Sequence, residues 1–572
     1  MRRWRARSGS TALLALAAAG LLVAGCGGGS SPGGEDAGSN KGTGCEGFCQ
    51  DDATRLSASD VRKVIAQAAA EADARGEAAT IAVVDRVGNV LGLFRMNGAD
   101  TTVTVTSTPD RAGDVDGGLE DVNIVPDTLA AISKAVTGAY LSSEGNAFTT
   151  RTASQIVQAH FNPGDFKTAG GPLFGVQFSQ LPCSDLATRF DAGDPVNAGP
   201  HRAPLGLSAD AGGLPLYKNG TPVGGVGVIA DGVYGLSPKQ LGGGRAAGID
   251  ELAALAGSFD FGAPPDRRAN RITVEGKTLR FATAEPDDLR SNAGNPPAFG
   301  SLAGVQPAVS GYTDGSIRAG TAFSKPASGI RASSNPAFSG QDAFVLVDDT
   351  NTPRFPPTAG TAPADPLTQN EVATLLSEAL AVANRARAQI RRPLGSEARV
   401  TISVVDTDGD VLGIVRGRDA PVFGIDVSLQ KARTAAFFSG SDAAGELNAA
   451  PAAEYLDGGL TTLRNESIGQ YVTAVQQFIN DGQALTGGTA FSDRAGGNLS
   501  RPFFPDGIDG EPAGPFSKPG GHDLPTEWSP FSVGLQLDLV YNAVIRHVGA
   551  VQGIGPGFLG PSTGTALNCT GV

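Results

Sequence analysis

Ile81–Ala99 reads IAVVDRVGNVLGLFRMNGA, and Ile402–Ala420 reads ISVVDTDGDVLGIVRGRDA, 321 residues further along the chain. Ten of the nineteen aligned positions are identical. Each stretch has an apolar β-type run, a glycine-containing reversal and a second β-type run, which predicts a β-hairpin. A repeat this long, at so large an offset, is typical of two copies of a whole domain rather than of a short solenoid unit.

The composition of the chain bounds its organisation. Its 572 residues leave room for two large domains and a connector, and the 80 glycines and 37 prolines predict long loops around modest cores. The formal net charge is −14. Removal of the arginine-rich first residues makes it more negative, which argues against nucleic acid as a partner because phosphate binding needs a basic face.

The N-terminus has the pattern of an export signal. Four arginines in residues 1–7 precede a short apolar run that ends in Val23-Ala24-Gly25-Cys26. This end resembles the lipobox of bacterial lipoproteins, which implies a signal peptide over residues 1–25, lipidation of Cys26 and anchoring in the cell envelope. Gly27 at the next position favours the outer membrane. The alternative is an ordinary secretory peptide with a chance cysteine. Residues 26–54 are then a flexible tether.

Four further cysteines remain after Cys26 is set aside: Cys45, Cys49, Cys183 and Cys569. An even number of cysteines in an exported chain predicts two disulfides, with three possible connectivities. Structural zinc is disfavoured because Cys45 and Cys49 have no second close pair or neighbouring histidine.

The same order of elements is predicted twice. Helices that begin after the capping residues Ser57 and Thr368 precede the two hairpins, and a second helix follows each hairpin. Asn219-Gly220 predicts one more hairpin in the first copy, which the second copy lacks. We therefore expect domains at residues 55–265 and 366–550, a connector at 266–365 and a glycine-rich tail at 551–572.

These motifs, together with Gly212–Val228 (GGLPLYKNGTPVGGVGV), resemble the GlcG/HbpS family of haem-binding proteins. The resemblance implies an α+β fold: two profilin-like domains in tandem, each a largely antiparallel sheet flanked by helices. It also implies self-association, so we expect the two domains to pack as an intramolecular pseudo-dimer. Haem is the implied cofactor.

Haem would need axial ligands, and His160 is the first candidate, with Met96 as a possible second. Each has an ordinary alternative, a solvated histidine and a core methionine. Gly417 replaces Met96 in the second copy, which excludes a shared ligand at that position.

Two pairs of cations recur in both copies, Arg95 with Arg416 and Lys134 with Lys431. They could pair with haem propionates or another carboxylate ligand. The alternative is a surface charge or a structural ion pair. Asp85 and Asp406 end the first hairpin strands, and we expect them to stabilise the turns through their own hydrogen bonds.

No catalytic residues are assigned, because metalloprotease, P-loop and paired-carboxylate motifs are missing from the sequence. The favoured function is haem or tetrapyrrole binding in the envelope without turnover. One alternative is a surface scaffold that contacts other envelope components. Another is an enzyme or sensor that acts on a small hydroxy acid.

Overall fold

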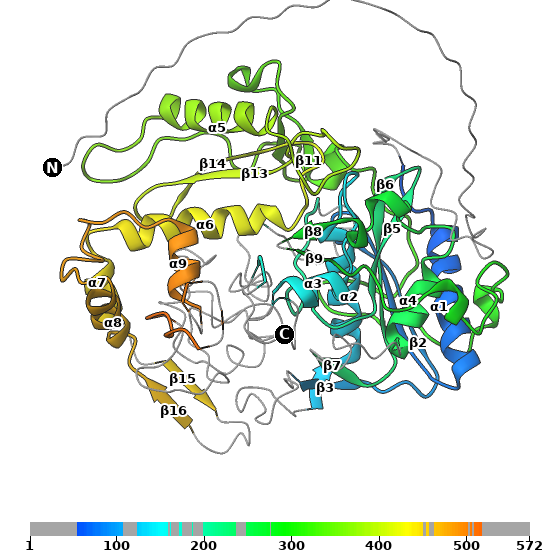
Figure 1. The fold of residues 1–572 in the computed structure, drawn as a ribbon. Coiled ribbons are helices and arrows are strands. Elements are labelled where there is room, and N and C mark those ends of the chain that lie inside the picture. Colours follow the sequence, from blue (N-terminus) through cyan, green and yellow to red (C-terminus); the bar gives the residue numbers. More distant parts are fainter. Residues whose placement is uncertain are drawn as a thin grey trace, which may run out of the picture. The chain divides into compact units, whose positions relative to one another are not determined.

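The computed structural model places two similar hairpins in a mixed arrangement of helices and sheets (Figure 1). The structure describes residues 54–106, 123–157, 161, 171–173, 186, 198–235, 247–274, 276–449, 453–456, 463–501, 504–505, 508 and 510–516. The predicted signal peptide (residues 1–25), the tether up to residue 53 and the predicted glycine-rich tail (residues 551–572) lie outside these residues.

The two predicted hairpins are formed and share one register. In the first, β1 (Thr80–Asp85) pairs antiparallel with β2 (Val90–Met96), and in the second, β13 (Thr401–Val405) pairs with β14 (Val411–Arg416). Every paired position, including a β-bulge after the fourth pair, recurs at the 321-residue offset. The shared register supports the duplication that the sequence indicates.

The first copy forms a five-stranded antiparallel sheet in the order β10-β2-β1-β6-β5. Its further strands are β5 (Gly213–Lys218), β6 (Thr221–Ile229) and β10 (Gly304–Val305). The hairpin predicted at Asn219-Gly220 is thus β5–β6, and both turn residues have positive φ.

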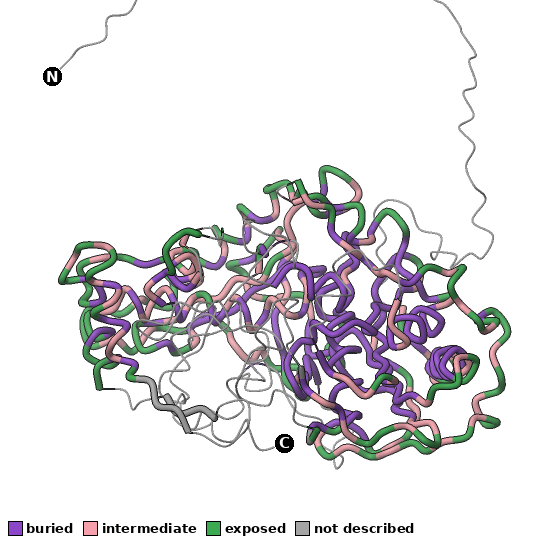
Figure 2. Tube along the Cα trace, turned by 60° about the horizontal axis from the view of Figure 1, so that its bottom comes forward, coloured by how far each residue is buried: buried purple, intermediate pink, exposed green. Residues whose placement is uncertain are grey.

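Helices cover both faces of this sheet. α2 (Asp127–Leu141) packs on β1, β5 and β6, while α1 (Ala58–Arg75) and α4 (Ile249–Gly257) pack on the other face. Alternate side chains of β1 accordingly belong to two separate apolar clusters. Ala82 and Val84 are in the cluster that includes α2, and Ile81 and Val83 are in the cluster that includes α1. β1 is therefore buried along its whole length. Figure 2 shows the buried segments of the described chain in purple.

The second copy has a sheet of order β11-β12-β14-β13, with β11 (Ile330–Ala332) and β12 (Phe344–Leu346). α5 (Gln369–Ala383) and α6 (Gly424–Ser439) take the places of α1 and α2. In the first copy β6 pairs with the outer side of β1, but the described residues of the second copy contain no strand in the equivalent place beside β13. β13 is therefore an edge strand and is only half-buried. Both copies have the predicted α+β class, antiparallel sheets with helices beside them.

Capping decides where the first helices begin. The side chains of Ser57 and Thr368 accept hydrogen bonds from the backbone N–H groups of Asp60 and Glu371, and both acidic side chains bond back to the cap. These are the capping boxes that the sequence predicts. The remaining elements are β3 (Thr102–Thr106), β4 (Asn123–Pro126), α3 (Thr150–Ile156), β7 (Val233–Gly235), β8 (Thr273–Val274), β9 (Lys277–Thr278), α7 (Ala443–Ala449), β15 (Ala453–Leu456), β16 (Leu463–Glu466), α8 (Gln470–Phe478) and α9 (Asp493–Leu499), with six short 3-10 turns between Pro265 and Phe338.

The connector supplies matching pieces to both hairpins, which sequence reasoning missed. The tetrapeptide Ala-Gly-Thr-Ala occurs at 319–322 and again at 359–362. The backbone N–H and the hydroxyl of Thr321 bond to Oδ2 of Asp85 at 3.0 and 2.8 Å, and those of Thr361 bond to Oδ2 of Asp406 at 3.3 and 2.9 Å. The connector also supplies β10, the edge strand beside β2, and β12, which pairs with β14 and carries β11 on its other side. A segment between the domains therefore completes both sheets.

The two hairpin aspartates have the predicted turn role. Oδ1 of Asp85 accepts from the N–H groups of Val87 and Asn89, both at 3.0 Å. Oδ1 of Asp406 accepts from those of Asp408 and Asp410 at 3.1 and 2.9 Å. The same side chain thus closes the turn in both copies.

Candidate functional site

Arg95 lies in a buried hydrogen-bond network of the first copy. Its Nε donates to Oδ2 of Asp127 at 2.7 Å, and its Nη2 donates to Oδ1 of the same carboxylate. The hydroxyl of Thr80, at the start of β1, also donates to Oδ2 at 2.5 Å. Asp127 is fully buried, so its carboxylate is held entirely by protein donors.

Arg416 occupies the same strand position in the second copy but has a different environment. It is fully buried, and its Nη2 donates to the carbonyl of Ala420. Its Nε and Nη1 have no hydrogen-bond partner in the described structure. Burial, followed by the charge of Arg86, lowers the pKa of Arg416 to about 9. The two equivalent arginines therefore differ in whether a carboxylate faces them.

Lys134, from α2, lies in a second buried charge cluster. Its Nζ is 2.7 Å from Oδ2 of Asp210 and 2.6 Å from Oδ2 of Asp250, and it donates to the carbonyls of Ala211 and Val228. Burial lowers its pKa, and the carboxylates of Asp210 and Asp250 raise it by more, so the net direction is upward. Lys134 is thus held by protein groups in this structure.

Lys431 is exposed, although it occupies the same helical position as Lys134. The partners of Lys134 come from the loop before β5, from β6 and from the N-terminus of α4, and the described residues of the second copy contain no equivalent of these strands or of this helix. The recurrence of the lysine therefore does not produce the same contacts in both copies.

Asp419 is the centre of a third charge cluster, which joins the two copies. Its Oδ1 accepts from Nη2 of Arg86 at 2.6 Å, and its Oδ2 accepts from Nη2 of Arg391. Both oxygens also accept from the backbone N–H of Glu144, at 3.0 and 3.1 Å. Burial raises the pKa of Asp419, but Arg391 and Arg86 hold it well below its usual value. This aspartate is ionised at neutral pH.

Glu144 lies beside this aspartate and pairs with Nη2 of Arg418. Burial and the nearby charge of Asp419 raise the pKa of Glu144 to about 7, against the opposing effect of Arg418. The Asp419 cluster, defined as Arg86, Arg391, Arg418, Glu144 and Asp419, contains more cations than carboxylates.

An aromatic ring connects Arg86 to Arg416. The guanidinium carbon of Arg86 lies 3.7 Å from the centre of the Phe323 ring, and that of Arg416 lies 6.0 Å from it. Nε and Nη1 of Arg86 also lack hydrogen-bond partners in the described structure. Two buried guanidinium groups with unused donors thus face one aromatic side chain.

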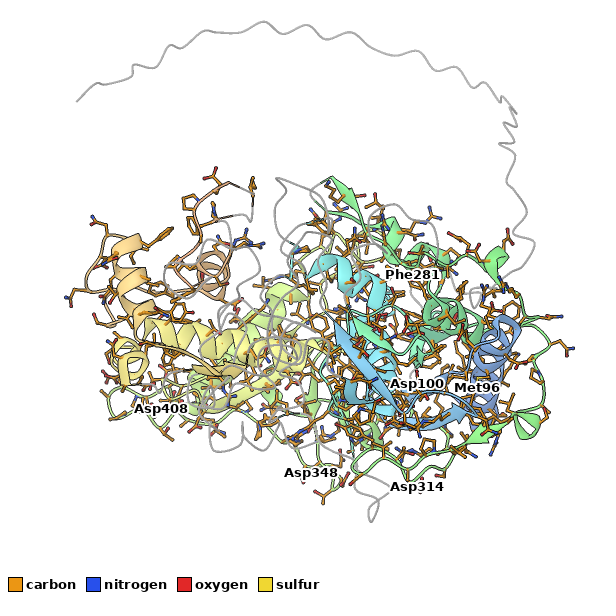
Figure 3. The ribbon with its side chains drawn as sticks, turned by 90° about the horizontal axis from the view of Figure 1, so that it is seen from below. Met96, Asp100, Phe281, Asp314, Asp348 and Asp408 are labelled. Carbon is orange, nitrogen blue, oxygen red and sulfur yellow. The ribbon has the colours of Figure 1, made fainter. Side chains whose placement is uncertain are left out.

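The predicted iron ligands are placed only in part. His160 lies outside the described residues. Met96 lies at the end of β2 (Figure 3), half-buried, and its sulfur accepts a hydrogen bond from the backbone N–H of Ala79 at 3.4 Å. His201 is buried, and its carbonyl accepts from the hydroxyl of Tyr140. The haem-ligand assignments of His160 and Met96 stay predictions.

Cys26, Cys45, Cys49, Cys183 and Cys569 also lie outside the described residues, so lipidation and disulfide pairing stay predictions. Within the described ranges, no helix has the length and apolar character needed to cross a bilayer. Those ranges also contain no group of three or more His, Cys, Asp or Glu side chains suited to a metal ion.

The fold and these clusters define a mixed α/β protein built on two related hairpin sheets with buried arginine–carboxylate networks. Residues 375–497 match the family model described as "Haem degrading protein HbpS-like". Over these residues, which lie in the second copy, the match confirms the family resemblance that the sequence shows. The match covers the larger part of the second domain, and no curated protein matches the chain.

Two solved structures are similar to part of the chain. Klebsiella pneumoniae protein ORFY, of family DUF336, is 18% identical, over 37% of this chain and 96% of its own, with a TM-score of 0.20. HbpS is 21% identical, over 37% of this chain and 91% of its own, with a TM-score of 0.19. At these values neither similarity locates a ligand in this chain.

Proposed function

We propose that this protein is an exported, lipid-anchored haem-binding protein whose two HbpS-like domains form an intramolecular pseudo-dimer. The observation that carries the haem assignment is the match of residues 375–497 to a family described by its action on haem. His160 remains the proposed axial ligand, and Arg416 is the proposed partner of a propionate, because Arg95 is already paired with Asp127.

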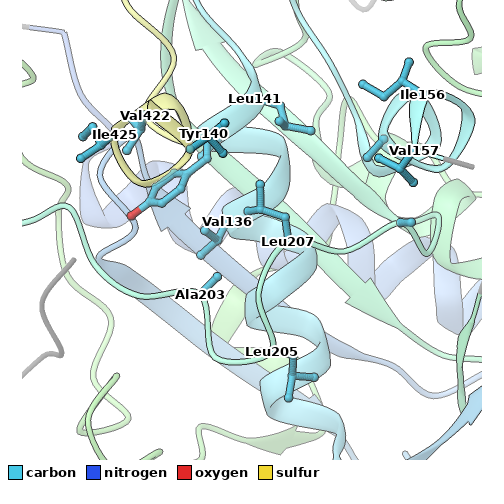
Figure 4. Packing of buried hydrophobic residues seen from close by; sticks show 14 of the residues in the cluster. Val136, Tyr140, Leu141, Ile156, Val157, Ala203, Leu205, Leu207, Val422 and Ile425 are labelled. Carbon is cyan, nitrogen blue, oxygen red and sulfur yellow. The ribbon is translucent and has the colours of Figure 1, made fainter. Parts of the chain in front are cut away.

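The pseudo-dimer is supported by contacts between the copies. Asp419 bonds to Arg86 and to the backbone of Glu144, and the N–H of Arg392 donates to the carbonyl of Gly145 at 2.8 Å. Apolar contacts accompany these bonds, since Val422 and Ile425 lie beside Tyr140 in one apolar cluster (Figure 4). A duplicated chain can satisfy internally an interface that separate copies would form between subunits.

Haem titration of the purified protein tests the haem proposal. We expect a saturable Soret band that weakens in His160→Ala, because loss of an axial ligand changes both affinity and spectrum. His522→Ala is the matched control and should leave the band unchanged. A titration without saturation would refute haem binding. A Soret band that decays during incubation with a reductant would show degradation, and would refute binding without turnover.

Substitution of the proposed lipidation site tests the anchor. We expect Cys26→Ser to release the protein from the membrane fraction, because a lipid chain supplies the membrane affinity. The variant should also lose incorporation of a labelled fatty acid. Cys45→Ser is the control. Equal fractionation and equal labelling of Cys26→Ser and the parent would contradict the proposal.

A further inference from the structure

The second copy lacks one carboxylate that the first copy uses. The two post-hairpin helices align through Lys134 and Lys431, and this alignment places Gly424, the first residue of α6, where Asp127 begins α2. Tertiary contacts agree with the alignment. The hydroxyl of Thr80 bonds to Asp127, and a Cβ atom at Gly424 would have the hydroxyl of the equivalent Thr401 as its nearest neighbour, at 3.6 Å.

Of the three side-chain donors that hold Asp127 in the described structure, two have equivalents without a partner in the second copy, while the third, Nη2 of the arginine, donates there to the carbonyl of Ala420. Oδ2 of Asp127 accepts from Nε of Arg95 and from the hydroxyl of Thr80. Their equivalents are Nε of Arg416 and the hydroxyl of Thr401, at the 321-residue offset. Both of these atoms are buried and have no hydrogen-bond partner in the described structure. A buried donor without an acceptor destabilises the folded state. Nε of Arg416 and the hydroxyl of Thr401 are therefore suited to bind a ligand that supplies an acceptor oxygen.

Space and charge also suit an anion at this position. Among the described residues, and apart from the chain neighbours of Gly424 and the backbone of its own helix, only the side chain of Thr401 comes within 4 Å of a Cβ atom at Gly424. Arg416 has lost the carboxylate that neutralises Arg95, and Arg86 adds a second cation near the same Phe323 ring. Asp419 bonds directly to Arg86 and its charge also acts on Arg416, but Arg416 itself donates only to the carbonyl of Ala420 in the described structure. A bound anion would give Arg416 the charged partner that Arg95 has in Asp127.

We propose that Arg416, Thr401 and Gly424 form a binding site for a small carboxylate, which replaces the missing side chain of Asp127. The ligand is a carboxylate group with about the bulk of acetate, because an aspartate side chain beyond its Cα is a CH₂–COO⁻ group. One of its oxygens accepts from Nε of Arg416 and from the hydroxyl of Thr401. The site does not depend on haem, although a free acid and a haem propionate share this chemistry.

Acetate titration of the haem-free full chain tests the proposal directly. We expect acetate to raise the melting temperature in a saturable way, because a ligand that binds only the folded state stabilises it. Sodium chloride at equal ionic strength is the salt control. In Gly424→Asp the new side chain occupies the site, so the acetate effect should be lost while the melting temperature without acetate rises. Gly424→Ala, which adds only a methyl group, is the control for helix propensity.

The first copy offers the reciprocal experiment. Asp127→Gly reproduces the second-copy arrangement around Arg95 and Thr80, so it should lower the melting temperature, and acetate should recover part of that loss. This arm stays informative if Gly424→Asp folds poorly. Acetate stabilisation that persists in Gly424→Asp, or that chloride reproduces in the parent, would overturn the proposal.

The source of the carboxylate is resolved by comparing haem with its dimethyl ester. If the site holds a propionate, Gly424→Asp and esterification should weaken haem binding by a similar factor, without additivity. If it holds a free acid, acetate should bind while haem affinity is unchanged in Gly424→Asp. Failure of haem to bind at all would refute the proposed function and leave the acetate result standing.

Discussion

Lys134→Met should destabilise the protein by about 3–5 kcal/mol, because it removes the cation from a buried cluster that holds two carboxylates. Lys134 is fully buried, and Asp210 and Asp250 both lie within 2.7 Å of its Nζ. Methionine fills a similar volume, so the loss reports the charge rather than a cavity. Lys431→Met is the matched control, since this exposed lysine has the same helical position, and its change should stay within about 0.5 kcal/mol.

The cost of Lys134→Met should depend on pH. Burial raises the pKa of Asp250 to about 6 and that of Asp210 well above its usual value, even beside Lys134. Without the lysine, both carboxyl groups favour the protonated form still more strongly. A group whose pKa is raised by folding stabilises the folded state at low pH and loses that contribution as pH rises through the folded pKa. Urea unfolding should therefore show a smaller loss at pH 5 than at pH 8, and an equal loss at both would contradict this account.

Asp419→Asn should cost about 3–5 kcal/mol at neutral pH, because it leaves two buried guanidinium groups without their carboxylate. Arg86 comes from the first hairpin and Arg391 from the loop before the second, so this one side chain links the copies. Asparagine keeps the size of aspartate and removes its charge. Asp408→Asn, on the exposed turn of the second hairpin (Figure 3), is the matched control and should have little effect.

The pH dependence of Asp419→Asn should have the opposite sign. Arg391 and Arg86 hold the pKa of Asp419 below its usual value of 3.8. A carboxyl group with a depressed folded pKa contributes stability above its unfolded pKa and loses it as pH falls below that value. The difference between parent and variant, measured by urea unfolding, should thus be full at pH 7 and shrink below about pH 4. A difference that grows on acidification would refute the role of this charge.

The sequence was informative wherever the determining contacts are local. Alternating apolar residues and the turn glycines predicted both hairpins, and Ser57 and Thr368 predicted the helix starts. The roles of Asp85 and Asp406 in their own turns were also predictable, because their acceptor atoms serve N–H groups two and four residues away.

The charge clusters were less predictable, because the residues that interact in them are far apart in the sequence. Lys134 and Lys431 look equivalent in sequence, yet only Lys134 meets Asp250, which lies 116 residues further along. The sequence predicted the connector to be mostly loop, but the backbone N–H of Thr321 in this connector donates to Asp85, 236 residues away in the sequence. The contact between the connector and the hairpins could have been predicted from the Ala-Gly-Thr-Ala tetrapeptide, which occurs twice in the connector, 40 residues apart.

The sequence by itself determined that one hairpin module occurs twice, since hydrophobic alternation and turn chemistry act over a few residues and persist in both copies. Only the tertiary structure decided which repeated charge is neutralised. Asp127 pairs with Arg95, whereas the helix position equivalent to Asp127 is Gly424 in the second copy. There, Nε of Arg416 and the Thr401 hydroxyl are buried without an acceptor in the described structure. The reason is that the hydrogen-bond and charge partners of a buried cation are set by the residues that the fold packs next to it. The position of the cation in a sequence repeat does not determine those partners.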